Sequence, residues 1–322
     1  MQFNIDQDRG DLIAGWVLPD NPSLEPRIIA RAGGREAIVP PSVMLSNLVD
    51  EGLHDTGRCG FEVSAAALPG LAEARDVRLY DEDSGLLLYA RRGPHAYAEA
   101  RLFVFDSRGA DTSLVAPRFA EAFHMAYVEA DQVPVETCKA CIELRFTTSL
   151  YVGGPVQFKA VEPFLQGRGF RLTALLADPA ELLFATLMPP EAAAEPDAPR
   201  RLAAVLNRLN ERQRAMLSDP LARRLTLLRH DDMLERDAVA LALDALSEFD
   251  AVGVEAALPE FMALTAAVCE ADERLFAVAP YRPPLELSAL LRREPGVQAL
   301  IGQDIEIYDA VADAILAARM TG

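Results

Sequence analysis

The sequence predicts a small all-β sandwich followed by an α/β domain with a parallel sheet and a largely helical C-terminal part. Short apolar stretches separated by turn-forming residues fill about the first 90 positions of the 322-residue chain. From Glu99 onward, strand-like stretches alternate with helical patterns. After Pro190, apolar residues recur at three- and four-residue spacing almost throughout. We expect the domain boundary within residues 91–98, with a β-sandwich domain over 1–97 and an α/β domain over 98–322.

Six stretches of the first domain have the composition of short strands: LIAGWVL, PRIIARA, EAIVP, GFEVSAA, DVRLYD and GLLLYAR. The segments between them (PDNP, AGG, PP, DTG and DEDSG) are rich in Gly, Pro and Asp, which favour turns. This rhythm is typical of a β-sandwich. The pairs Gly15-Trp16 and Gly60-Phe61 resemble those of small β domains attached to bacterial glycosyltransferases and other surface-polysaccharide enzymes.

In the second domain, RLFVFD, CIELRF and FRLTALLAD are the candidate strands. His124 falls on the helix expected after the first of them, where a surface or packing role, and not that of a base, is the plain interpretation. The connector PEAAAEPDAPR then leads into four amphipathic patterns: RRLAAVLNRLNERQRAML, DAVALALDALSEF, LPEFMALTAAVCEADERLF and GQDIEIYDAVADAILAARM.

Composition limits the possible partners and compartments. A net charge of -18 argues against nucleic acid or an anionic membrane surface as the main partner. Carboxylates interrupt every apolar stretch before the roughly 20 residues of a membrane span, and MQFNIDQDRGD lacks the features of a secretory signal. We therefore expect a cytoplasmic protein.

The cysteines and histidines do not form a metal-binding pattern. Among four cysteines, Cys138 and Cys141 form a single C-x-x-C, and the histidines are scattered. We expect no metal site. Ordinary reduced thiols are the simplest interpretation, and a labile redox pair is the alternative.

The turn after RLFVFD has the order strand, glycine-containing turn, helix that anion-binding loops use. Thr112 and Ser113 stand at the expected helix start, but Asp111 stands where a phosphate has to lie. We expect the Asp111 carboxylate to cap the helix. A surface ion pair between Arg108 and Asp111 in a plain turn is the structural alternative, and the Gly-x-x-x-x-Gly-Lys pattern is absent.

Four segments in order give the second domain a resemblance to bacterial and animal carbohydrate sulfotransferases, which use the sulfate donor PAPS. They are FVFDSRGADTSL, LYVGGPVQF, RLTALLADPAELLFATL and the late pair DAVGVEAALPEFMALTA and DIEIYDAV. The resemblance covers most of residues 102–320 and implies a three-layer, P-loop-like domain with a parallel sheet.

Matched residue by residue, the donor-site motifs of this family are largely lost. Arg108 stands at the lysine position and Asp111 replaces the second glycine. Ala177 and Leu182 stand at the two arginines of the 3′-phosphate motif and Ala185 at its serine, while Asp178 and Pro179 are kept. We expect no cofactor. If a donor does bind, the resemblance implies that these residues hold it: Arg108, Gly109, Thr112, Ser113 and Asp178.

An arginine-rich segment lies in residues 199–230, where eight arginines and two acids give a local charge of +6. A solvated helix face is the plain interpretation. The functional one is that Arg200, Arg201, Arg223 and Arg224 bind an acidic polysaccharide, a nucleotide or an acidic protein surface beside the strand ends.

Two functions remain open at this point. The first is a non-catalytic or strongly diverged sulfotransferase-fold protein that binds or assembles components of cell-surface polysaccharide synthesis, with glycans or polysaccharide-synthesis proteins as partners. The second is an active glycan sulfotransferase, or another transferase with an altered donor site. The sequence does not determine the oligomeric state.

Overall fold

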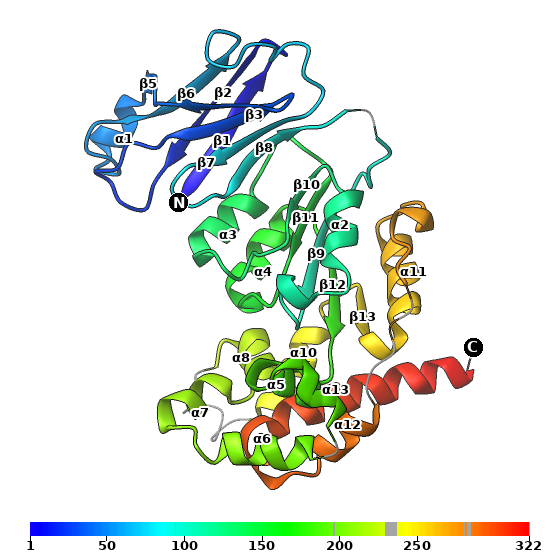
Figure 1. Ribbon diagram of the computed structural model, residues 1–322. Helices are drawn as coiled ribbons and strands as arrows, with labels where there is room; N and C mark the ends of the chain where they lie inside the picture. Colours follow the sequence, from blue (N-terminus) through cyan, green and yellow to red (C-terminus); the bar gives the residue numbers. More distant parts are fainter. Residues whose placement is uncertain (94, 196, 229–236, 280, 282–284, 322) are drawn as a thin grey trace.

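The computed structural model describes residues 1–93, 95–195, 197–228, 237–279, 281 and 285–321. Two antiparallel sheets form its N-terminal part, and a five-stranded parallel sheet with helices follows (Figure 1). The predicted mixed α/β layout is confirmed at this level.

The N-terminal sheets have four strands each. The first has the order β1 (Gln2–Asp8), β2 (Leu12–Leu18), β6 (Arg58–Ser64) and β5 (Val43–Met44), with helix α1 (Ser46–Asp50) between the last two in sequence. The second has the order β4 (Arg35–Val39), β3 (Ile28–Ala32), β7 (Val77–Asp81) and β8 (Leu87–Arg91). Every neighbouring pair is antiparallel. Apolar side chains of both sheets, such as Ile13, Val63, Ile28 and Leu79, belong to one buried cluster.

The two glycine-aromatic pairs lie opposite each other on β2 and β6. Gly15 is registered with Phe61 and Trp16 with Gly60. A Cβ atom at Gly15 would lie 2.3 Å from the carbonyl oxygen of Asn4 and 3.1 Å from the Phe61 ring. Gly15 therefore allows β1 and the Phe61 side chain to approach β2 closely.

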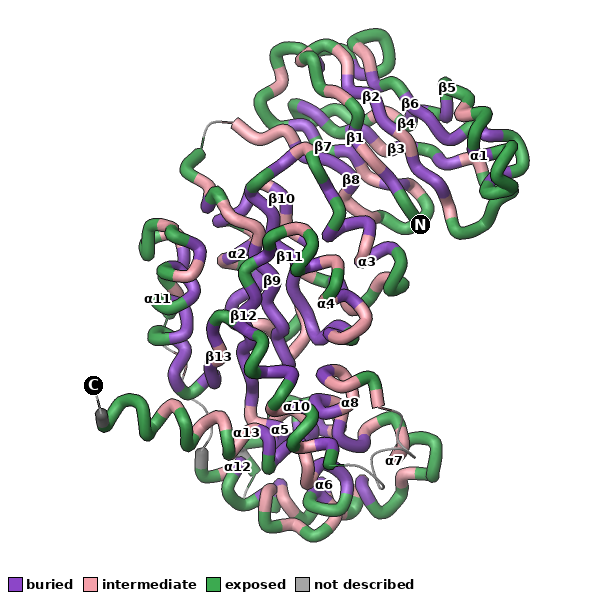
Figure 2. Tube along the Cα trace, turned by 180° about the vertical axis from the view of Figure 1, so that it is seen from behind, coloured by how far each residue is buried: buried purple, intermediate pink, exposed green. Residues whose placement is uncertain are grey.

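The parallel sheet has the order β10 (Met125–Tyr127), β11 (Leu150–Gly153), β9 (Arg101–Asp106), β12 (Arg171–Leu176) and β13 (Ala251–Val254). All four pairings are parallel. β9 is first in sequence and central in the sheet. Nearly all residues of β9, β11 and β12 are buried (Figure 2). The predicted strand CIELRF is wrong, because Cys141 and Ile142 end helix α3 (Val135–Ile142) with their side chains buried.

Helices cover both faces of this sheet. Leu102, Val104 and Leu175 face α2 (Ala116–Ala122) and α11 (Leu258–Val268) in one buried cluster. Residues of opposite orientation, such as Phe103 and Phe105, belong to the buried cluster that also contains the core residues of the N-terminal sheets. That cluster contains side chains of α3, α4 (Phe158–Gly167), α8 (Pro220–Thr226) and α10 (Ala238–Leu246).

A further helical layer lies beyond the strand ends. Its core joins α5 (Pro179–Leu187), α6 (Ala198–Leu206), α12 (Leu285–Leu291) and the first part of α13 (Pro295–Thr321). The long helix predicted from residue 200 to 217 is divided, because Asn210 caps a separate helix α7 (Glu211–Leu217) with a capping box. His124 follows α2 instead of lying on it, and its ring lies near Tyr97. In the described part of the chain, no helix is long and apolar enough to cross a membrane.

Candidate binding site at the ends of the parallel strands

A cavity of about 340 Å³ opens where the parallel strands end. The loop after β9 (residues 107–111) forms one wall, and Asp131 and Pro155, which follow β10 and β11, form another. Helices α5, α8 and α13 close it with Leu182, Arg224 and Asp304. Open parallel sheets bind ligands at this edge, because the loops that follow the strands meet there. The cavity is therefore the candidate site of the second domain.

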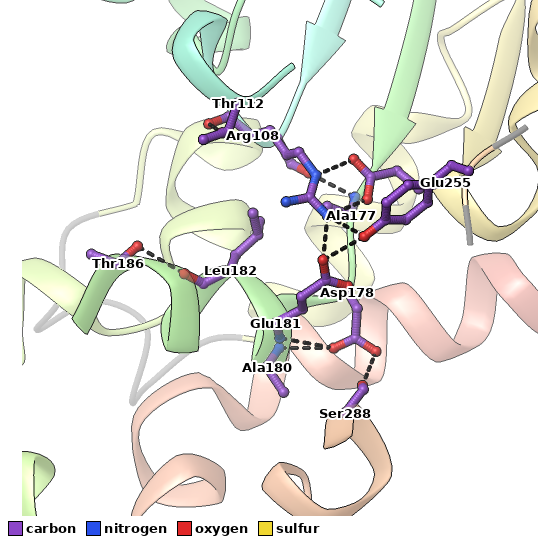
Figure 3. Close-up of polar contacts among 12 residues, drawn as sticks. Arg108, Thr112, Ala177, Asp178, Ala180, Glu181, Leu182, Thr186, Glu255 and Ser288 are labelled. Carbon is purple, nitrogen blue, oxygen red and sulfur yellow. Dashed lines mark hydrogen bonds and ion pairs between the residues drawn. The ribbon is translucent and has the colours of Figure 1, made fainter. Parts of the chain in front are cut away.

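Arg108, the residue at the expected lysine position, points away from solvent into a cluster of carboxylates (Figure 3). Its Nε and Nη2 atoms donate to the two carboxylate oxygens of Glu255, with Nη2 2.7 Å from Oε2. Nη2 also lies 2.6 Å from Oε1 of Glu181 and 3.1 Å from the hydroxyl of Tyr281. The Arg108 side chain is 8% exposed and that of Glu255 is 3% exposed. The alternative of a surface pair with Asp111 is wrong, because the end of β13 brings Glu255 against the guanidinium.

The protonation of this cluster follows from its burial. Burial raises the pKa of Glu255 to about 7, although Arg108 opposes the rise through hydrogen bonds and charge. Burial also opposes the charge of Arg108, but Glu255 and Glu181 outweigh it and raise the arginine's pKa above its ordinary value. Arg108 therefore stays a cation whose charge and hydrogen-bond donors are directed at two carboxylates.

The turn after β9 is stabilised mainly by its own hydroxyl groups. Ser113 Oγ donates to Asp106 and accepts from the N–H groups of Val115 and Ala116, at 3.1 and 2.8 Å. The Thr112 hydroxyl donates to the Arg108 carbonyl at 3.1 Å. Gly109 has φ +77°, a conformation that favours glycine. Both hydroxyl groups that the resemblance assigns to a donor thus have partners within the turn.

Asp111 does not cap the helix, and that prediction is wrong. A 3₁₀ turn occupies Ala110–Thr112, α2 begins only at Ala116, and Ser113 binds the first N–H groups instead. Asp111 is exposed and lines the cavity, and its side chain makes no capping hydrogen bond. Its carboxylate therefore adds negative charge to the cavity wall.

Asp178 and Pro179 end β12 and start α5. Asp178 Oδ1 accepts from the N–H of Ala180 at 2.9 Å, and Pro179 occupies the first turn. Asp178 Oδ2 accepts from Ser288 and from Arg292, whose Nη2 lies 2.7 Å away. This carboxylate joins β12, α5 and α12.

The other positions that the resemblance assigns to a 3′-phosphate motif offer no cation. Leu182 lines the cavity as an apolar side chain, and Ala185 is exposed on α5. The N–H of Ala177 donates to Ser107 Oγ at 2.8 Å. No group at these three positions can pair with a phosphate.

The charged groups that remain in the cavity are mostly acidic. Asp304 is 1% exposed and accepts from the N–H groups of Leu221 and Ala222 at 2.9 Å, and burial raises its pKa to about 7. Asp131 Oδ1 is buried without a hydrogen-bond partner among the described residues. Arg224 is the cation that faces them. It has no ion pair with a described residue, and burial lowers its pKa, against the opposing charge of Asp131.

The four arginines predicted to bind an anion have different surroundings. Arg200 is exposed on α6, and the neighbouring Arg201 pairs with Glu195. Arg223 on α8 donates to the Met216 carbonyl at 2.6 Å. Of the four, only Arg224 lines the cavity. Arg229 and His230, the last residues of the predicted basic segment, lie outside the described residues.

The cysteines are free and buried. Burial raises the pKa of Cys138 to about 12 and that of Cys141 well above its ordinary value, so neither is a thiolate at neutral pH. In the part of the chain that the structure describes, no group of three or more His, Cys, Asp or Glu is arranged to hold a metal ion.

Comparisons with known proteins add no family assignment. No protein-family model matches the chain, and no curated protein matches it.

Sequence reasoning missed Glu181 and Glu255, the carboxylates that occupy Arg108. Glu255 directly follows the short strand AVGV, and Glu181 lies in the first turn of the helix that Asp178 caps. Recognising AVGV as a strand places Glu255 at the same sheet edge as Arg108. That signal was available in the sequence, but the surrounding alanine-rich helices obscured it.

Proposed function

We propose that this chain is a non-catalytic or strongly diverged sulfotransferase-fold protein that acts as a binding or assembly component in cell-surface polysaccharide synthesis. The observation that carries the proposal is the burial of Arg108 against Glu255 and Glu181. A sulfate donor needs a free cation at this position, but the Arg108 guanidinium is already paired with the carboxylates of Glu255 and Glu181. The parallel sheet with β9 at its centre and helices on both faces supports the P-loop-like fold.

The electrostatics of the cavity also oppose an anionic donor. Asp111, Asp131 and Asp304 line the same space as the turn after β9. A phosphate about 4 Å from one carboxylate meets roughly 4 kcal/mol of repulsion at an effective dielectric constant near 20. Each lost charged hydrogen bond removes a further 1.5–3 kcal/mol or so. Ala177, Leu182 and Ala185 stand where the resemblance expects two arginines and a serine. The absence of these three hydrogen-bonding side chains therefore lowers the affinity for PAPS by about three to six orders of magnitude.

The polysaccharide part of the proposal rests on the N-terminal domain. Apolar side chains of its two antiparallel sheets lie in one buried cluster, which continues into the second domain. The glycine-aromatic pairs that resemble polysaccharide-enzyme domains are registered across β2 and β6. We infer that this domain connects the second domain to a glycan or to a protein that makes one.

The alternative is an active glycan sulfotransferase or another transferase with an altered donor site. One observation favours it: Arg224 lines the cavity without an ion pair to a described residue, and it is a cation that a donor anion could use. In that case Arg224 binds the donor anion, which Arg108 cannot do because it is paired with Glu255 and Glu181.

A transfer assay with radiolabelled sulfate on PAPS and a panel of neutral and acidic glycans tests the two functions against each other. We expect no transfer above a no-protein control. Asp111→Gly alone is expected to remain inactive, because Arg108 stays paired and the 3′-phosphate groups stay absent. Transfer by the unmodified protein that Arg224→Gln abolishes, while Arg200→Gln does not, would contradict the proposal and establish the alternative.

A further inference from the structure

A second hollow lies between the N-terminal sheets and the α/β domain, away from the strand ends. It has a volume of about 440 Å³ and is formed by β1 and β2 on one side and α3 and α4 on the other. The N-terminus lies beside α3 in Figure 1. The N-terminal amine donates there to Thr137 Oγ1 at 3.0 Å. The volume is within the range of small-molecule sites. We call this hollow the interdomain groove.

The sheet side of the groove presents one aromatic ring beside two amides. Asn4 and Trp16 are directly registered on β1 and β2, and Gln2 lies two residues from Asn4. These three side chains therefore share one face of the sheet. Trp16 is half-buried, packs against the cluster of Leu18, Leu48 and Cys59, and also lines the groove. The Trp16 side chain therefore contacts this cluster and is also accessible from the groove.

The helix side carries a single cation in excess. Lys139 lies 2.8 Å from Glu136, and Arg168 lies 3.6 Å from Glu143, so these four charges largely cancel. Arg145 is exposed, lines the groove and has no ion pair with a described residue. Arg145 thus leaves one positive charge on a groove that Trp16 also lines.

We propose that the interdomain groove binds an acidic oligosaccharide, with a sugar ring against Trp16 and a carboxylate or sulfate on Arg145. An aromatic face covers the apolar C–H face of a sugar. Gln2 offers a donor and an acceptor to sugar hydroxyl groups, and Asn4, whose Nδ2 donates to Asp6 at 2.7 Å, offers its amide oxygen as an acceptor. Arg145 supplies a charged, bidentate partner for the acid group. A peptide strand is the competing occupant, because β1 is the edge strand of its sheet and lines the groove. The aromatic ring and the side-chain amides favour a sugar over it, and the titration below includes a peptide to separate the two. The choice of a glycan rests on the proposed role in polysaccharide synthesis, and it does not depend on the state of the strand-end cavity.

Trp16 is the only tryptophan of the chain, so its fluorescence reports on this groove directly. We would titrate tetragalacturonate, maltotetraose and a pentaglutamate peptide into the full-length protein at low salt, following tryptophan emission and calorimetric heat. The expected result is a saturable change in emission with tetragalacturonate, at least tenfold weaker binding of maltotetraose and no comparable response to the peptide. Both Arg145 and Gln2 have exposed side chains. Arg145→Gln is expected to weaken the binding of tetragalacturonate at least tenfold, and Gln2→Ala is expected to weaken it about threefold. Arg9→Gln, at the far end of the β1–β2 hairpin, is the charge-matched control and should leave it unchanged.

Three results would overturn the inference. An equal response to pentaglutamate would show a site that recognises charge alone. Binding that is unchanged in Arg145→Gln would remove the proposed contact. Heat of binding without any change in Trp16 emission would place the glycan elsewhere and contradict this groove. The absence of both signals would contradict the proposed ligand, while the proposed function is tested separately by the transfer assay.

Discussion

Replacing Arg108 with methionine should destabilise the protein strongly. The substitution keeps most of the side-chain volume but removes the cation from a cluster in which Glu255 is 3% exposed and Glu181 is 14% exposed. Removing one partner of a buried ion pair typically costs about 3–5 kcal/mol, because the remaining charge stays buried without compensation. We therefore expect the free energy of unfolding to fall by about 3–5 kcal/mol at pH 8.

The loss should be smaller at pH 6. The pKa of Glu255 is already about 7, and without Arg108 it rises further, so at pH 6 the carboxyl is neutral and leaves little charge uncompensated. Urea denaturation followed by circular dichroism at the two pH values measures this difference. Arg31→Met is the matched control, because the Arg31–Glu36 pair has half of each side chain exposed, and its loss should be within experimental error. If Arg108→Met is as mild as the control at pH 8, Arg108 is free to bind a ligand and the reasoning fails.

Two further predictions concern the fold. Glu255 and Asp304 both have pKa values of about 7, above the ordinary 4.5 and 3.8. Between about pH 4 and 7 the folded state therefore binds more protons than the unfolded state. As a result, these two groups make the free energy of unfolding fall as pH rises through this range. Asp304→Asn should flatten that slope in urea denaturation, and an unchanged slope would contradict the assignment. Gly15→Ala should lower the melting temperature, with a loss of about 1–3 kcal/mol, because its Cβ meets the Asn4 carbonyl. Gly167→Ala, at the end of α4 with no atom near its Cβ, should be neutral or stabilising, and equal effects of the two would refute the packing argument.

The central strands could be predicted from sequence because burial on both faces gives them uninterrupted apolar stretches. RLFVFD became β9, and FRLTALLAD contains β12. CIELRF has the composition of a strand, but its first two residues belong to the buried side of α3, and β11 begins eight residues later at Leu150. β13 was missed because AVGV is only four residues long and lies among alanine-rich helices.

The location of the candidate site could be predicted from the sequence, but the partners of its charged residues could not. The loop after β9 was identified from its strand-turn order, and it does line the cavity at the strand ends. The partners of its arginine come from Glu255, 147 residues away, and from Glu181, 73 residues away. Such pairings depend on sheet order and on helix packing, which local propensity does not encode. The domain boundary near residue 97 and the anion-binding role of the four arginines stay predictions.

Calorimetric titration of PAPS and of its desulfated product into the unmodified protein tests the central claim most directly. With Arg108 paired to Glu255 and Glu181 and no cation at Ala177 or Leu182, we predict no saturable heat up to millimolar concentration of either nucleotide at low salt. Binding in the micromolar range that depends on Arg108, Thr112 or Ser113 would contradict the account, because it would mean that the turn after β9 still holds a donor.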